Sequence, residues 1–178
     1  RQEQAADRTD FIGTLRRQGR MHPAIAEFPG ETFYFAERLV PVPLRHQQET
    51  ELGYALPAQD RVDELLKRHR LLFFASEDCR QPDLSDKVNA AEARLVASLL
   101  RRIRRFYGSR FEPDKTVGVI VPYRNQIAMI RQEIELLGLP GLEQVSIDTV
   151  ERYQGSQRDV IIYSFTIQQR WQLGFLTA

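Results

Sequence analysis

The chain has 178 residues, of which 42% are hydrophobic and 28% charged, and its formal net charge at pH 7 is +1. This length suits one domain with a substantial core, and the near-neutral charge argues against nucleic-acid binding by bulk electrostatics alone. A single cysteine, Cys79, excludes an internal disulfide and a cysteine-based zinc cluster. The sequence shows no signal pattern and no apolar run near the roughly 20 residues that cross a bilayer. We therefore expect a cytoplasmic protein.

The first third of the chain predicts two helices and an irregular stretch. Residues 4–18 have helical spacing, and Gly19 would end that helix. A shorter helix is predicted at 23–28, where a proline stands at an early helical position and a Pro-Gly pair follows. Residues 38–60 are punctuated by prolines and predict an irregular surface excursion. Three aromatic residues are expected to pack inward as an anchor: Phe33, Tyr34 and Phe35.

The rest of the chain alternates apolar runs with amphipathic helices. Asn89 and Glu92 have the spacing of a capping box, which predicts a helix that runs to about Tyr107; a turn or two of helix is also predicted at 62–67. Four short apolar runs bounded by polar residues predict strands: 71–75, 117–121, 145–148 and 160–165. This alternation predicts an α/β domain with a parallel sheet flanked by helices.

Two polar turns follow predicted strands, and parallel strands bring such turns to one edge of a sheet. The first is Pro122–Gln126, which leads into a helix with aliphatic residues at core spacing. The second turn has hydroxyl and amide groups that suit phosphate, ribose or nucleic-acid backbone, and a glycine that lets backbone approach a ligand. Its candidate residues are Thr149, Gln154, Gly155 and Gln157.

Three segments, in order, resemble motifs of superfamily 1 helicases, in the branch typified by the nonsense-mediated-decay helicase. Gln18-Gly-Arg-Met-His-Pro23 resembles the Gln-Tyr-Arg-Met-His-Pro segment of that branch. Val117-Gly-Val-Ile-Val-Pro-Tyr-Arg-Asn-Gln126 resembles motif IV, and Thr149-Val-Glu-Arg-Tyr-Gln-Gly-Ser-Gln-Arg-Asp-Val-Ile-Ile162 resembles motif V. The resemblance implies that residues 1–178 are a single second RecA-like motor domain, with a P-loop NTPase-like fold, cut from a longer protein.

The resemblance also implies roles for individual residues. Arg20 would act catalytically, by reaching the γ-phosphate of ATP as an arginine finger, because a guanidinium is permanently charged and forked. The alternative is a surface arginine paired with a local carboxylate. The implied nucleotide-binding residues are Gln18, Gln154, Gly155 and Gln157. The implied nucleic-acid-binding residues are Pro122, Tyr123, Asn125 and Thr149, although Tyr123 could equally be an ordinary half-buried tyrosine and Gln126 a helix N-terminal residue.

The expected function is that of the C-terminal motor domain of an ATP-dependent DNA or RNA helicase. ATP and Mg²⁺ would be held mainly by a preceding RecA-like domain, because this sequence has neither the lysine loop nor the magnesium-binding carboxylate, and no metal site of its own is expected. The isolated fragment should therefore be inactive. The expected partners are that domain and single-stranded nucleic acid, DNA ahead of RNA, without a membrane. The resemblance implies movement from 5′ to 3′.

Two positions depart from the family pattern. Gly19 replaces an aromatic residue that stacks on the base, and Gln157 replaces an acidic residue. These departures leave open a second function, a non-catalytic nucleic-acid-binding or interaction module that retains the helicase fold. A nucleoside-phosphate enzyme that shares only the fold is a third option.

Other polar features have ordinary structural interpretations. The run Arg101–Arg105 is interpreted as a solvated helix end whose cations complement the helix dipole. Cys79 is interpreted as an unreactive thiol, because no histidine stands in a suggestive relation to it. Asp159 is expected to order its loop by pairing with Arg158 or Arg152.

Overall fold

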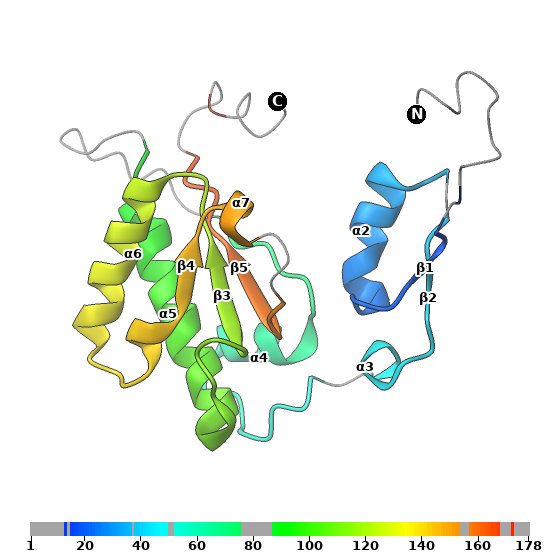
Figure 1. Ribbon diagram of the computed structural model, residues 1–178. Helices are drawn as coiled ribbons and strands as arrows, with labels where there is room; N and C mark the ends of the chain where they lie inside the picture. Colours follow the sequence, from blue (N-terminus) through cyan, green and yellow to red (C-terminus); the bar gives the residue numbers. More distant parts are fainter. Residues whose placement is uncertain are drawn as a thin grey trace. The chain divides into compact units, whose positions relative to one another are not determined.

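The computed structural model describes residues 13, 15–36, 38–49, 52–75, 87–153, 157–167 and 172. The chain divides into two compact units, Arg1–Phe73 and Phe74–Ala178 (Figure 1). The prediction of a single domain over residues 1–178 stays a prediction. None of the described helices is long and apolar enough to cross a membrane.

The second unit is built on a parallel sheet, which confirms the predicted α/β class. Its described strands are β3 (Val117–Ile120), β4 (Ser146–Asp148) and β5 (Val160–Tyr163). They lie in the order β4-β3-β5, so β3 is central (Figure 1). Its register pairs Val119 with Ile147 on one side and with Ile162 on the other. Three of the four predicted strands are therefore present in one sheet.

Two long helices, α5 (Ala90–Tyr107) and α6 (Arg124–Leu137), supply the core of this unit together with one face of the sheet. The N-cap of α5 is Asn89, whose Oδ1 accepts a hydrogen bond of 3.0 Å from the amide of Glu92. Glycines with positive φ end both helices, Gly108 at 54° and Gly138 at 59°. The predicted helix from the cap at Asn89 to about Tyr107 is confirmed, as is the helix predicted after the turn at Pro122. Two short 3₁₀ turns follow them, η1 (Gly108–Arg110) and η2 (Leu142–Gln144).

Side chains alternate along a strand, so the other face of the sheet is lined by the alternate residues of each strand. This face is covered differently. Gly118 of β3 points to this face, and a Cβ there would overlap the phenol of Tyr153. Tyr153 ends the short helix α7 (Val150–Tyr153) and is buried. Ile161 of β5 is 46% exposed on the same face. Within this unit, therefore, helix cover is unequal on the two faces.

Among its described residues, the first unit has a parallel pair of two-residue strands and three helices. The strands are β1 (Arg17–Gln18) and β2 (Val40–Pro41). The helices are α2 (Pro23–Phe33), α3 (Arg45–Gln48) and α4 (Arg61–Arg68). Helix α4 confirms the helical prediction at 62–67. The stretch 38–60 contains β2 and α3, and its other described residues have no regular structure.

Two helix predictions in this unit are wrong at their ends. Arg17–Gln18 is a strand, because Val42 donates its amide to the Gln18 carbonyl at 3.0 Å, a pairing that local spacing cannot reveal. Residues 4–12 lie outside the described residues. Helix α2 continues through Pro29 to Phe33, and the Tyr34 amide still bonds to the Gly30 carbonyl at 3.3 Å. A proline removes one helical hydrogen bond, and here it does not end the helix.

Two burial predictions are also wrong. The apolar run 71–75 is not a strand, and Leu71 and Phe73 are 59% and 80% exposed. No described strand pairs with this run. The prediction of an interior strand rested on its apolar composition alone. The expected aromatic anchor is exposed as well: Phe33, Tyr34 and Phe35. Cys79 lies outside the described residues.

Candidate functional site

The carboxyl edge of the sheet brings together the turns that the sequence singles out. The amide of Val121, after β3, donates to the carbonyl of Asp148 at the end of β4 at 3.0 Å. The amide of Ser164, after β5, donates to the carbonyl of Ile120 at 2.9 Å. The turns that begin at Pro122 and Thr149 therefore leave adjacent strands at one edge.

The turn after β3 presents an aromatic ring with a nearby cation. Tyr123 is the half-buried N-cap of α6, and the ammonium of Lys87 lies 6.0 Å from the centre of its ring. Pro122 is half-buried, whereas Asn125 is exposed in the first turn of the helix. An aromatic face beside a cation and an amide can bind a base and a phosphate.

The turn after β4 is held close to the sheet by α7. The half-buried Thr149 donates its amide to Oδ1 of Asp148 at 3.0 Å. The hydroxyl of Tyr153 donates to the carbonyl of Ser146 at 3.3 Å, and this bond ties the end of α7 to the start of β4. The position of Thr149 is therefore fixed from both sides.

The charged residues of this loop pair differently from the prediction. Arg152 lies 3.8 Å from the carboxylate of Asp148. Asp159 accepts a hydrogen bond of 3.3 Å from the hydroxyl of Tyr107, and Arg158 donates to the carbonyl of Gln157 at 2.8 Å. The expected pairing of Asp159 with either arginine is therefore wrong.

Of the predicted nucleotide-binding residues in this loop, the structure describes one. Gln157 is exposed. Gln154 and Gly155 lie outside the described residues. Arg20 and Gln18 belong to the first unit. The structure thus brings the turns that carry the predicted strand-binding residues to one edge of the sheet. The predicted nucleotide-binding set stays a prediction.

A buried polar network, which the sequence analysis missed, lies behind this edge. Gln126 is fully buried; its Oε1 accepts from the Asn89 amide at 2.8 Å, and its Nε2 donates to the Asn89 carbonyl at 2.9 Å. Glu92 is also buried, and its Oε2 accepts from the Ser164 hydroxyl at 2.6 Å and from the Thr166 amide at 2.9 Å. The network joins the N-termini of α5 and α6 to the segment after β5.

This network revises the predicted capping box. The Asn89 side chain caps the helix as expected. The Asn89 backbone amide, however, bonds to Gln126 rather than to the Glu92 side chain, and the Glu92 carboxylate accepts from Ser164. The missed signal was an acidic residue on the apolar face of α5, four positions before the buried Val96. Thr166 is buried with a φ of 59°, a left-handed conformation that a threonine adopts only under surrounding constraint.

In the first unit, Arg20 is exposed at the tip of the turn Gln18–Met21. The side-chain amide of Gln18 brackets the backbone of Met21: Nε2 donates to the carbonyl at 2.8 Å, and Oε1 accepts from the amide at 2.9 Å. Gln18 therefore shapes the turn that carries the arginine.

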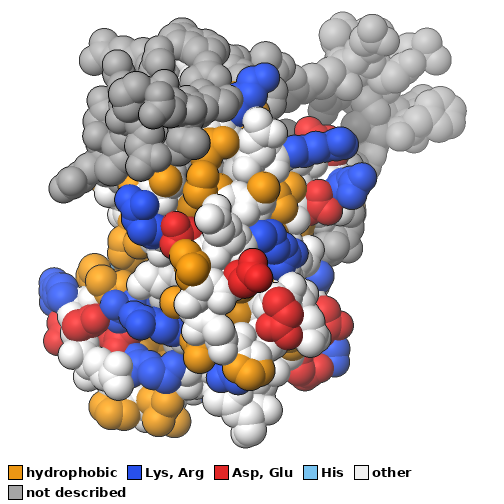
Figure 2. Space-filling view, turned by 90° about the vertical axis from the view of Figure 1, so that its left-hand side faces the viewer, with side chains coloured by type: hydrophobic (Ala, Val, Ile, Leu, Met, Phe, Trp, Pro, Cys, Tyr) orange, Lys and Arg blue, Asp and Glu red, His pale blue; other side chains and the backbone are white. Residues whose placement is uncertain are grey.

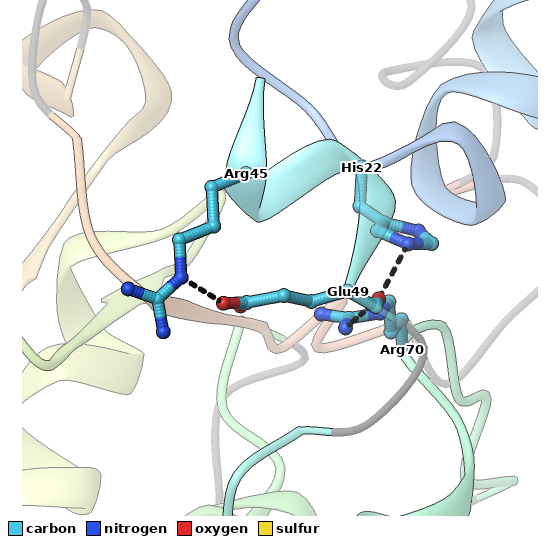
Figure 3. A network of polar contacts seen from close by, with 4 residues as sticks. All are labelled: His22, Arg45, Glu49 and Arg70. Carbon is cyan, nitrogen blue, oxygen red and sulfur yellow. Dashed lines mark hydrogen bonds and ion pairs between the residues drawn. The ribbon is translucent and has the colours of Figure 1, made fainter. Parts of the chain in front are cut away.

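His22 orients backbone next to this turn (Figure 3). Its Nδ1 accepts from the Ala24 amide at 3.1 Å and caps α2, so Nε2 carries the proton and donates to the Glu49 carbonyl at 3.1 Å. Arg70 donates to the same carbonyl at 2.6 Å. Burial, and then the charge of Arg70, lower the pKa of His22, which favours the neutral ring.

The described residues on the surface over α6 form no cluster of positive charge (Figure 2). Figure 2 shows this side of the second unit, where the basic, acidic and hydrophobic side chains of the described residues are interleaved and form no broad field of one sign. Binding of a phosphate backbone by charge alone needs clustered cations. The described residues of this face therefore offer no such site, which agrees with the net charge of +1.

Comparison with known proteins adds a family match that covers almost the whole chain. The family model AAA_12, described as an AAA domain, matches residues 2–178. The putative helicase MOV-10 of Gallus gallus is 30% identical over 93% of this chain and 18% of its own length. The DNA polymerase alpha-associated DNA helicase A of Saccharomyces cerevisiae is 27% identical over 94% of this chain and 25% of its own length. A regulator of nonsense transcripts 1 homolog of Arabidopsis thaliana is 26% identical over 91% of this chain and 12% of its own length. The chain thus spans a quarter or less of these relatives.

Proposed function

Because this chain belongs to the AAA_12 family, the C-terminal helicase domain of superfamily 1 helicases, we propose that it is the second RecA-like half of an ATP-dependent motor that moves along single-stranded nucleic acid. The family match over residues 2–178 is the observation that carries this proposal. The adjacency of the turns at Pro122 and Thr149 supports it, because a strand track needs contacts from neighbouring loops.

Arg20 is the proposed catalytic residue of this half. ATP and Mg²⁺ bind mainly to the preceding RecA-like domain, and the Arg20 guanidinium approaches the γ-phosphate across the cleft between the two domains. There it neutralises charge that develops in the transition state. The exposed position of Arg20 on a turn braced by Gln18 supports this role. Gln154, Gly155 and Gln157 are proposed to face the same nucleotide.

The carboxyl edge of the sheet is the proposed contact with the strand. The ring of Tyr123 stacks on a base, while Asn125 and Thr149 bond to phosphate or sugar oxygens. Closing and opening the nucleotide cleft moves these turns relative to the preceding domain, and the strand advances with them. The compartment proposed for this activity is the cytoplasm, and the strand is proposed to be DNA ahead of RNA.

The test compares the intact protein with the 178-residue chain. ATP turnover is measured with no nucleic acid, with oligo(dT) and with oligo(U). The proposal expects stimulated turnover in the intact protein and none in the isolated chain, which lacks the phosphate-binding lysine loop. Intact protein that binds ATP and single strands but shows no stimulation at any concentration contradicts the motor.

A second candidate is a non-catalytic module that binds single strands and retains the fold. Gly19 favours it, because the fold does not demand a glycine there: a Cβ would lie 3.4 Å from Leu44 and 3.9 Å from Val42, both ordinary contacts. The fold around Gly19 therefore does not explain why the aromatic ring, which would stack on the base, is missing. Strand binding without ATP turnover in the experiment above identifies this module.

A further inference from the structure

The turn that carries Arg20 is held by hydrogen bonds from a residue of α3. Nε2 of Gln47 donates to the Gln18 carbonyl at 3.0 Å and to the Met21 carbonyl at 2.8 Å. A primary amide has two N–H groups, and both are used here. The two carbonyls that frame the turn are thus tied to one nitrogen atom from a residue 26 positions beyond Met21.

Gln47 has one unpaired polar atom in this buried position. The residue is only 4% exposed, although its neighbours in α3 are exposed. Its Oε1 is buried and has no hydrogen-bond partner among the described residues. Leaving a buried acceptor unpaired costs about 1–3 kcal/mol, whereas an apolar side chain of the same length would avoid that cost. A local conflict of this kind is expected at functional sites, where shape takes precedence over stability.

A second side chain of α3 supports the same turn. Nε2 of His46 lies 2.9 Å from the Gly19 carbonyl. Two consecutive residues of α3 therefore contact the backbone on both sides of Arg20, at residues 18, 19 and 21. The contacts engage backbone carbonyls alone and leave the Arg20 side chain exposed.

We infer that Gln47 is a positioning residue for Arg20, and that α3, which belongs to none of the three motifs, sets the rate of ATP hydrolysis through this turn. The inference rests on the proposed role of Arg20. A guanidinium that acts only in the transition state must be placed accurately, because a displacement of about 1 Å can reduce the rate about 100-fold. Without Gln47 the two framing carbonyls lose their tie and the turn can relax.

The test is Gln47→Met in the intact protein, with Gln48→Met as the matched control. Methionine has nearly the length of glutamine but donates no hydrogen bond. We expect Q47M to lower kcat for strand-stimulated ATP hydrolysis about tenfold or more, with KM for ATP changed less than about twofold, since the finger acts on the transition state. Q48M, at an exposed position of the same helix, should match the wild type.

A double-mutant cycle separates this inference from the proposed function. In an Arg20→Ala background, Q47M should cause no further loss, because Gln47 acts through Arg20. An equal further loss in that background overturns the inference, as does a wild-type kcat in Q47M when R20A is impaired. If R20A itself keeps full activity, the proposed function fails instead.

A second variant tests whether Gln47 is needed for the fold itself. Gln47→Glu keeps the shape but replaces the donor with an acceptor, and it should lose kcat as Q47M does. If neither variant melts cooperatively near the wild-type temperature, Gln47 is needed for the fold itself, and the inference is overturned.

Discussion

The carboxylate of Glu92 accepts a hydrogen bond of 2.6 Å from the hydroxyl of Ser164, a residue 72 positions later in the chain. The same oxygen accepts the amide of Thr166 at 2.9 Å. One buried carboxylate therefore connects the start of α5 to the segment that leaves β5. This connection holds the edge of the sheet at which the proposed strand contacts lie.

Replacing Glu92 with alanine should destabilise the 178-residue chain by about 3 kcal/mol, because two buried donors lose their acceptor. Gln should cost less, about 1 kcal/mol, since one oxygen remains but the charge-assisted bonds weaken. Urea unfolding measures both values. Glu135→Ala, at an exposed site on α6, is the control. Equal stability of E92A and the control would show that the network is energetically neutral.

Gly118→Ala should destabilise the chain by about 2 kcal/mol or more, because the new Cβ overlaps the phenol of Tyr153 in a packed interior. The comparison is Gly30→Ala in α2, where a Cβ meets open space and alanine should add about 0.5–1 kcal/mol. Thermal unfolding distinguishes the two changes. Tyr153→Leu should reduce the cost of G118A, and strict additivity of the two variants argues against the overlap.

The fold around His22 should lose stability in acid. His22 has a pKa below its ordinary value of 6.5, owing first to burial, then to the charge of Arg70 and, more weakly, of His46, against the opposing bond to Glu49. Because the unfolded state then binds more protons, the stability from neutral His22 is present above pH 6.5 and is lost as the pH falls through the folded pKa.

Titration of the His22 ring by NMR measures this pKa directly. Stability is followed from pH 7.5 to pH 5 in the wild type and in His22→Asn, which keeps a capping side chain and does not titrate. The variant should lose less stability in that interval. A measured His22 pKa at or above 6.5 contradicts the account.

Tyr123→Ala should weaken binding of oligo(dT) to the intact protein by about 1–3 kcal/mol, the usual contribution of one stacked base. Tyr123→Phe keeps the ring and should bind nearly as the wild type does. Fluorescence anisotropy at fixed salt gives both affinities. An alanine variant with unchanged affinity identifies Tyr123 as an ordinary half-buried tyrosine.

The sequence predicted those elements whose determinants are local. Helix α5 was predictable because its cap at Asn89, its apolar stripe and the glycine at 108 all lie within one segment. Strand β1 was not, since its formation depends on Val42, more than twenty residues away. The apolar run 71–75 failed for the related reason that burial of a strand depends on its neighbours.

The candidate site divides in the same way. Parallel strands imply that the turns at Pro122 and Thr149 share an edge, and they do. The contacts of Gln47 and Glu92 span 26 to 74 positions, so no spacing within a motif could reveal them. Side chains that brace a site from a distant segment have no local signature.

The catalytic role of Arg20 is tested most directly by single-turnover ATP hydrolysis in the intact protein, with saturating oligo(dT). Arg20→Ala should slow the chemical step about 10³-fold or more, the usual contribution of an arginine finger, while ATP binding changes little. Arg17→Ala, an exposed arginine on β1, should retain the wild-type rate. A wild-type rate in R20A would contradict the proposal that this chain completes the ATP site of a motor.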